Sequence, residues 1–190
     1  GYTVVAGKKK THFDASEKQK LTAQNVKEHI VVIPDSGGKI RVESVNKQYG
    51  HPEYRGIFEI DLVDKALHII NELPLEEYLY SVVPSEMPTE YQKEALKAQA
   101  VMLRSSLYRK MQQEDTKLAE LTTADSSYLS VAEQKNKWGD SYEETEKKLL
   151  EAVSQTKGVV AVYEGMPVMG CYHGMSAGMT RDGAELSDAY

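Results

Sequence analysis

A single glutamate, Glu86, lies between two prolines in the run Pro84-Ser85-Glu86-Met87-Pro88. Proline has no amide hydrogen and its ring moves the preceding residue out of helical angles, so this run predicts a stiff, non-helical elbow. A carboxyl group on a backbone with few alternative shapes is preorganised for acid/base catalysis. Glu86 is therefore the leading catalytic candidate. The local pattern alone favours a plainer interpretation, an exposed or capping residue in a proline-rich turn.

Two cations, Lys97 and Arg104, are seven residues apart and so lie on nearly the same side of a helix predicted over residues 90–111. At the border of the apolar stripe they could orient a polar substrate or stabilise developing negative charge. A solvated helix edge with snorkelling side chains is the more probable interpretation for Lys97, and the two interpretations balance for Arg104.

A polar loop, His173 to Thr180, follows a predicted strand near the end of the chain. His173 and Ser176 could form part of a nucleophilic arrangement, but the chain has no Gly-x-Ser-x-Gly elbow. Cys171 lies within the strand, where a buried small hydrophobe is the usual role. A serine or cysteine hydrolase built on His173 is thus a weaker hypothesis. The remaining histidines lack metal-ligand spacing: His12, His29, His51 and His68.

The elements that would position these side chains follow from the hydrophobic pattern. Alternation over residues 40–71 predicts a small antiparallel sheet, and the apolar patch Ile30 to Ile33 makes residues 1–39 a strand-bearing lead-in. Helical spacing predicts helices over 74–83, 90–111 and 142–156, with a polar, irregular connection over 112–141 and a hairpin formed by 159–163 and 168–172. The fold class is therefore α+β, with a helical core (about 74–111 and 142–156) packed with small antiparallel sheets.

The composition excludes several classes of protein. The chain has 190 residues, of which 23 are Lys or Arg and 29 are Asp or Glu, and its net charge of -6 argues against a general nucleic-acid partner. A hydrophobic fraction of 41% supports a globular fold. No apolar run approaches the roughly 20 residues that span a bilayer, so we expect no membrane span. No leader opens the sequence, and we expect any signal or anchor to lie upstream or to have been removed.

The run Asn71 to Pro88, followed by Glu94 to Val101 and Arg104, resembles the signature of the stage II sporulation protein D family. Later blocks resemble that family in the same order: Ala152-Val153, Thr156 to Val160, Tyr163 to Gly165, and His173 to Thr180. The resemblance implies a family domain over residues 40–190 after the lead-in 1–39. That domain would be incomplete at its C-terminus, since family members continue further.

The family cleaves peptidoglycan glycan strands between N-acetylmuramic acid and N-acetylglucosamine without water, leaving 1,6-anhydro ends. Its catalytic glutamate falls on Glu86. One carboxyl group suffices for this reaction, unlike ordinary glycoside hydrolysis, because the 6-hydroxyl of the muramic acid replaces the attacking water. Asp125 and Tyr128 occupy places where the family tends to have polar cleft residues. Together with the candidates above, the expected substrate-binding residues are Lys97, Arg104, Asp125, Tyr128, His173 and Ser176.

The sequence departs from the family in two places. The usual His-Ser-x-Ser-Gly-Gly block reads His173-Gly174-Met175-Ser176-Ala177-Gly178. Some members bind zinc through His and Cys after the long helix, but the corresponding run, Thr123 to Tyr128, has neither, so we expect no metal and no cofactor.

Glycan strands are the expected partner, with a cell-wall amidase or other sporulation wall-remodelling proteins as further candidates. The expected location is extracytoplasmic, with a membrane anchor upstream. Relatives are also described as amidase enhancers, so the alternative function is a glycan-binding accessory module that does not cut.

Overall fold

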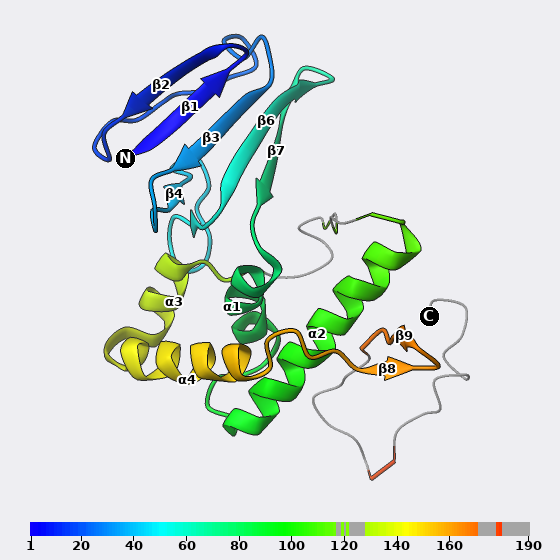
Figure 1. Ribbon diagram of the computed structural model, residues 1–190. Coiled ribbons are helices and arrows are strands. Elements are labelled where there is room, and N and C mark those ends of the chain that lie inside the picture. The colour runs from blue at the N-terminus through cyan, green and yellow to red at the C-terminus, as the bar shows by residue number, and fades with distance from the viewer. Residues whose placement is uncertain (117–118, 120, 122–127, 171–177, 180–190) are drawn as a thin grey trace.

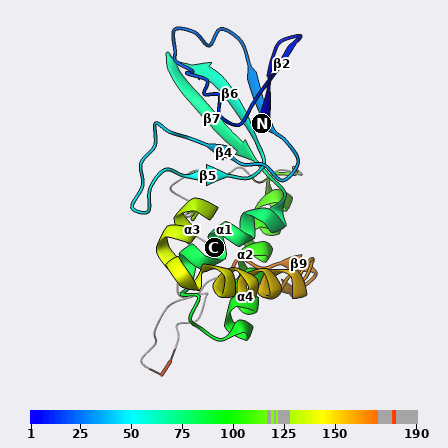
Figure 2. The same cartoon turned by 90° about the vertical axis from the view of Figure 1, so that its left-hand side faces the viewer.

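The computed structural model describes residues 1–116, 119, 121, 128–170 and 178–179. These residues form a twisted β-sheet at one end of the molecule and a group of helices at the other (Figures 1 and 2). A mixed α+β architecture is therefore confirmed. The small pair β4 (Ile40–Arg41) and β5 (Glu53–Tyr54) lies between the two parts.

The sheet has five antiparallel strands in the order β2-β1-β3-β6-β7. The strands are β1 (Tyr2–Ala6), β2 (Lys9–Phe13), β3 (Ile30–Pro34), β6 (Ile57–Val63) and β7 (Ala66–Glu72). The lead-in thus supplies three strands to the same sheet as β6 and β7, while the division of the chain at residue 40 into a lead-in and a family domain stays a prediction.

The register explains which face of the sheet is buried. Ile30 lies opposite Ile60, and Val32 lies opposite Phe58. Because side chains alternate between faces, these four residues point to the same side, where they pack with Val26. The alternating apolar residues Phe58 and Ile60 therefore lie on the buried face of the sheet.

Four α-helices are found in the described residues: α1 (Leu75–Glu86), α2 (Lys93–Gln113), α3 (Val131–Trp138) and α4 (Tyr142–Gln155), with the 3-10 turn η1 (Gly139–Ser141) before α4. Their apolar faces share one core, with fully or almost fully buried members on α1, α2 and α4: Leu79, Val83, Leu96, Ala100, Leu149, Ala152 and Val153. The predicted helices over 90–111 and 142–156 are confirmed to within three residues at each end.

The predicted non-helical elbow is wrong for its first half. Helix α1 continues through Pro84 and ends at Glu86, and Met87 takes an extended conformation, with φ -136° and ψ 134°. Proline inside a helix removes one hydrogen bond. Here the carbonyl of Tyr80, four residues earlier, accepts instead from Nε2 of Gln134 at 2.9 Å. A bond from a distant residue therefore lets the helix run past its proline.

Two further predictions need correction. The connection over 112–141 contains α3, whose N-terminus is a capping box between Ser130 and Glu133. The C-terminal hairpin also differs, since β8 (Val162–Tyr163) lies within the predicted strand 159–163 but β9 (Met166–Pro167) comes before the predicted second strand at 168–172.

The backbone at Gly56 passes close to the end of β7, just before α1. Its φ is +80°, and a Cβ atom would lie 2.1 Å from the carbonyl oxygen of Glu72, at the end of β7. Gly37 has a similar φ of +72° but nothing within 4 Å of a Cβ atom. Both alanine variants carry left-handed strain of about 1–2 kcal/mol. Gly56→Ala should lower the free energy of unfolding by about a further 1–3 kcal/mol in urea titrations. Equal losses in the two variants would contradict the close approach.

Candidate active site

Glu86 is the last residue of α1 and is partly buried. It therefore lies at the C-terminal end of one helix, and six residues separate it from the start of the next helix at Lys93. Its turn is held from outside the helix at two carbonyl groups. The carbonyl of Tyr80 accepts from Gln134 at 2.9 Å, and that of Ser81 accepts from the amide of Leu129 at 2.9 Å.

The connection after Glu86 is tied to α4. Nζ of Lys148 donates to the carbonyl oxygens of Thr89, at 2.8 Å, and Tyr91, at 2.5 Å. Lys93 at the start of α2 forms an ion pair of 3.2 Å with Glu151. The backbone on the far side of Glu86 is thus fixed as well, so both neighbours of the candidate acid have defined positions.

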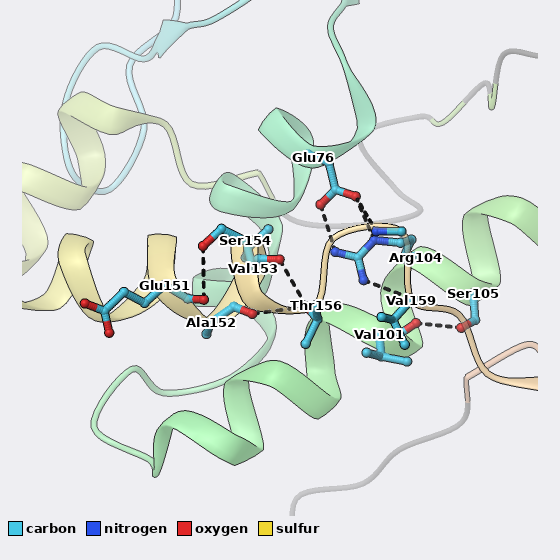
Figure 3. Close-up of polar contacts among 11 residues, drawn as sticks. Glu76, Val101, Arg104, Ser105, Glu151, Ala152, Val153, Ser154, Thr156 and Val159 are labelled. Atoms are coloured by element: carbon cyan, nitrogen blue, oxygen red, sulfur yellow. Dashed lines mark hydrogen bonds and ion pairs between the residues drawn. The ribbon is translucent and has the colours of Figure 1, made fainter.

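Arg104 is fully buried, with 0% of its side chain exposed. Its Nε and Nη2 donate to the two carboxylate oxygens of Glu76 on α1, at 2.9 and 2.8 Å, and its Nη1 donates to the carbonyl of Val159 at 3.0 Å. Figure 3 shows the guanidinium reaching both partners from α2. Arg104 thus joins three segments, and in this structure it has no surface to offer a ligand.

Lys97 lies in the second turn of α2 and forms an ion pair with Glu94, three residues earlier, at 2.7 Å. Its side chain is 22% exposed, which leaves part of its surface open. This arrangement is compatible with the plain interpretation of a helix edge.

Tyr128 lies in an aromatic cluster between the sheet and α1. Its ring stacks on Tyr54 with centroids 5.3 Å apart and lies 6.3 Å from the ring of Tyr78. Burial raises the pKa of its hydroxyl group, with a further raising effect of Glu77, whereas Ser81 and Arg55 act in the opposite sense. Tyr128 is consequently a neutral hydroxyl group near pH 7.

Three predicted site residues, Asp125, His173 and Ser176, lie outside the described residues. The segment that precedes His173 and Ser176 is held against α2 by two hydrogen bonds. The amide of Ala161 donates to Oγ of Ser105 at 2.8 Å, and that of Gly170 donates to Oγ of Ser106 at 2.8 Å.

Arg104 and Tyr128 contact α1 at residues well before Glu86. Arg104 contacts Glu76 and Tyr128 contacts Tyr78, both near the start of α1. At 1.5 Å per residue, Glu76 is about 15 Å from Glu86 along the helix axis. Arg104 therefore supports α1 at its other end, and the ring of Tyr128 contacts α1 about two turns before Glu86.

Two hollows lie beside α1 and α4. One, of about 470 Å³, lies between the end of the sheet and α1, and its polar and charged lining includes Asp35, Arg55 and Glu77. The other, of about 400 Å³, follows α4. Tyr80 and Leu150 line both, and Glu86 lines neither. The two hollows thus meet along α1, about 9 Å by axial rise from Glu86.

Two residues important to the site were missed in the sequence. Glu76, the partner of Arg104, carries no sequence signal beyond an acidic residue in a first helical turn. Gln134 becomes recognisable only once α3 is identified, and the spacing of Ser130 and Glu133 was the available signal.

Among residues 1–116, 119, 121, 128–170 and 178–179, no group of three or more His, Cys, Asp or Glu side chains could hold a metal ion. None of the helices in that part of the chain is both long enough and apolar enough to cross a bilayer.

The fold and site define an α+β domain that presents one glutamate at the end of a proline-containing helix. The profile of the SpoIID family, described as Stage II sporulation protein, matches residues 63–163, more than half of the chain. The chain belongs to this family.

Two curated relatives share the name Stage II sporulation protein D. The protein from Bacillus amyloliquefaciens is 32% identical over 181 residues, covering 85% of this chain and 51% of the relative. The protein from Bacillus subtilis is 37% identical over 127 residues, covering 64% of this chain and 36% of the relative. The chain thus spans about half or less of the length of these relatives.

Removing the Arg104 side chain tests its role. Arg104→Met leaves Glu76 without its buried partner and should lower the free energy of unfolding by about 3–5 kcal/mol in urea titrations. Lys110→Met breaks a 3.9 Å pair with Glu114 on the outside of the same helix and serves as the control, with an expected change of at most about 1 kcal/mol. Similar losses in both variants would show that the buried pair does not hold the helices together.

Proposed function

We propose that this chain is the catalytic part of a peptidoglycan lytic transglycosylase, with Glu86 as its acid and base. The observation that carries the proposal is the position of Glu86 at the fixed end of α1, with the backbone held on both sides by bonds from α3 and α4. Membership in the SpoIID family supports the same assignment.

The proposed reaction needs one carboxyl group. Protonated Glu86 gives its proton to the glycosidic oxygen as the bond from that oxygen to the anomeric carbon of N-acetylmuramic acid breaks. The 6-oxygen of the same sugar then bonds to the anomeric carbon and gives its proton to the Glu86 carboxylate. The acid is regenerated, no water is consumed, and the products are a 1,6-anhydro end and a free N-acetylglucosamine end.

A strand lying along α1 would meet Tyr80 and the two hollows on one side of Glu86. Aromatic and polar side chains with open space beside them are the usual elements of a ligand site. Lys97 would approach from α2, and Asp125, Tyr128, His173 and Ser176 would complete the cleft. Arg104 would act through Glu76 and the position of α1.

The accessory function remains the second candidate, and one observation favours it. Glu86 lines neither of the two hollows beside α1. A module that binds glycan strands for an amidase partner would need such surfaces and no acid. For either function, we propose an extracytoplasmic location, an upstream anchor and no metal cofactor.

Replacing the candidate acid separates the two functions. Glu86→Gln keeps the shape but cannot transfer protons, so the rate of forming anhydro-muramic ends from purified glycan strands should fall at least about 100-fold, measured by mass spectrometry. Strands with and without stem peptides should both be assayed. Glu90→Gln, at an exposed site in the following connection, is the matched control and should keep the wild-type rate.

Formation of anhydro-muramic ends by Glu86→Gln at the wild-type rate would contradict the proposed catalytic role. Tight strand binding by wild-type protein with no products would instead favour the accessory module. Loss of products in Ser176→Ala, with a normal rate in Glu86→Gln, would point to a nucleophilic mechanism involving His173.

A further inference from the structure

We propose that Gln134 is a positioning residue for Glu86, because its side-chain amide replaces the backbone hydrogen that Pro84 lacks. The effect on catalysis rests on the proposed function, whereas the structural coupling between Gln134 and Pro84 stands without it.

The geometry around Tyr80 leads to this assignment. In an α-helix, the carbonyl of residue 80 accepts from the amide of residue 84, but residue 84 is proline. Nε2 of Gln134 donates to that carbonyl at 2.9 Å and to the carbonyl of Leu129 at 2.9 Å. Both hydrogens of the Gln134 amide group are therefore used, and the residue is 2% exposed. Water has little access to replace it.

Gln134 is itself firmly held. Glu133, its neighbour, accepts from the amide and hydroxyl groups of Ser130 at 3.0 and 2.7 Å, which fixes the first turn of α3. Lys47 from the β4–β5 region lies 3.8 Å from the same carboxylate. The amide of Leu129 reaches the carbonyl of Ser81 beside Tyr80. The donor therefore comes from a rigid segment, and α1 conforms to it.

This contact lies close enough to Glu86 to determine its position. Residues 80 to 86 make up the last two turns of α1, and the amide of Met87 closes the helix on the carbonyl of Val83 at 3.0 Å. A helix freed at a proline bends or frays at that point. Without Gln134, the segment that carries Glu86 would lose the bond that sets its direction, while the first turn would stay attached to Arg104.

A double-mutant cycle in urea titrations tests the hydrogen bond. Gln134→Met keeps the approximate size but removes the donor, and should lower the folding equilibrium constant about tenfold. Pro84→Ala restores a backbone amide at residue 84. In the Pro84→Ala background, Gln134→Met should lower the constant less than threefold, since only the bond to Leu129 is lost. Equal effects in both backgrounds would overturn the proposal.

A Gln134→Met protein that unfolds alone but folds with Pro84→Ala would show the same coupling. Failure of both proteins to fold would overturn it.

Kinetics test the positioning of Glu86. In Gln134→Met, kcat on glycan strands should fall at least tenfold with KM within twofold of wild type, and Pro84→Ala should restore part of the loss. Ile60→Val in the sheet core is the control for general destabilisation, with kcat unchanged. A normal kcat in folded Gln134→Met would overturn the positioning role.

A spectroscopic readout keeps the inference separate from the proposed activity. In ¹³C-labelled protein without substrate, the carboxyl carbon resonance of Glu86 should shift in Gln134→Met, return toward wild type with Pro84→Ala, and stay in place in Ile60→Val. If the wild-type protein forms no anhydro ends but the variants show these shifts, the proposed function alone is contradicted. An unchanged resonance in Gln134→Met would contradict this inference.

Discussion

A buried guanidinium group must find its hydrogen-bond acceptors inside the protein, and Arg104 finds them on two other segments. Glu76 takes two of its bonds and the carbonyl of Val159 takes a third. Leaving a buried charge without its partner is far more costly than losing an exposed pair. The crossing of α1 and α2 and the path of the chain toward β8 are therefore set together. Glu76 also accepts from the amide of Gly158 at 3.4 Å, at the left-handed turn that ends α4.

The other end of α1 is held by neutral bonds from the segment Tyr128 to Gln134. That segment also connects to the sheet side of the molecule. Nζ of Lys47 donates to the carbonyl of Tyr128 at 3.2 Å, and Nδ2 of Asn136 donates to the carbonyl of Tyr49 at 2.6 Å. Helix α3 is thus a bridge between the β4–β5 region and the turn that carries Glu86. A shift of the β4–β5 region or of α3 would therefore move the backbone that carries the candidate acid, without direct contact to its side chain.

Local periodicity was enough to predict the α+β class, α2, α4 and the inner face of the sheet, because each of these patterns is contained in a short stretch of chain. The passage of α1 through Pro84 could not be predicted in the same way, since the replacing donor, Gln134, is 50 residues away and comes from a helix that looked like a polar loop. The burial of Arg104 depends likewise on Glu76, 28 residues earlier, and Val159, 55 residues later. Glu86 was proposed from its neighbours in sequence, whereas the bonds that hold its helix come from residues far away in sequence.

A carboxyl group that gives a proton and then takes one back depends on its own position more than on a second catalytic side chain. In paired-acid glycosidases, the second carboxylate holds a water or attacks the sugar, so two side chains must be placed relative to each other. With the 6-hydroxyl of the sugar as the nucleophile, only the distance from one carboxyl group to two oxygens of the same substrate matters. A short helix fixed at both ends meets that requirement. The contacts that Arg104 and Tyr128 make with Glu76 and Tyr78, earlier in α1, are then compatible with catalysis, because these residues need only hold the helix or the strand in place.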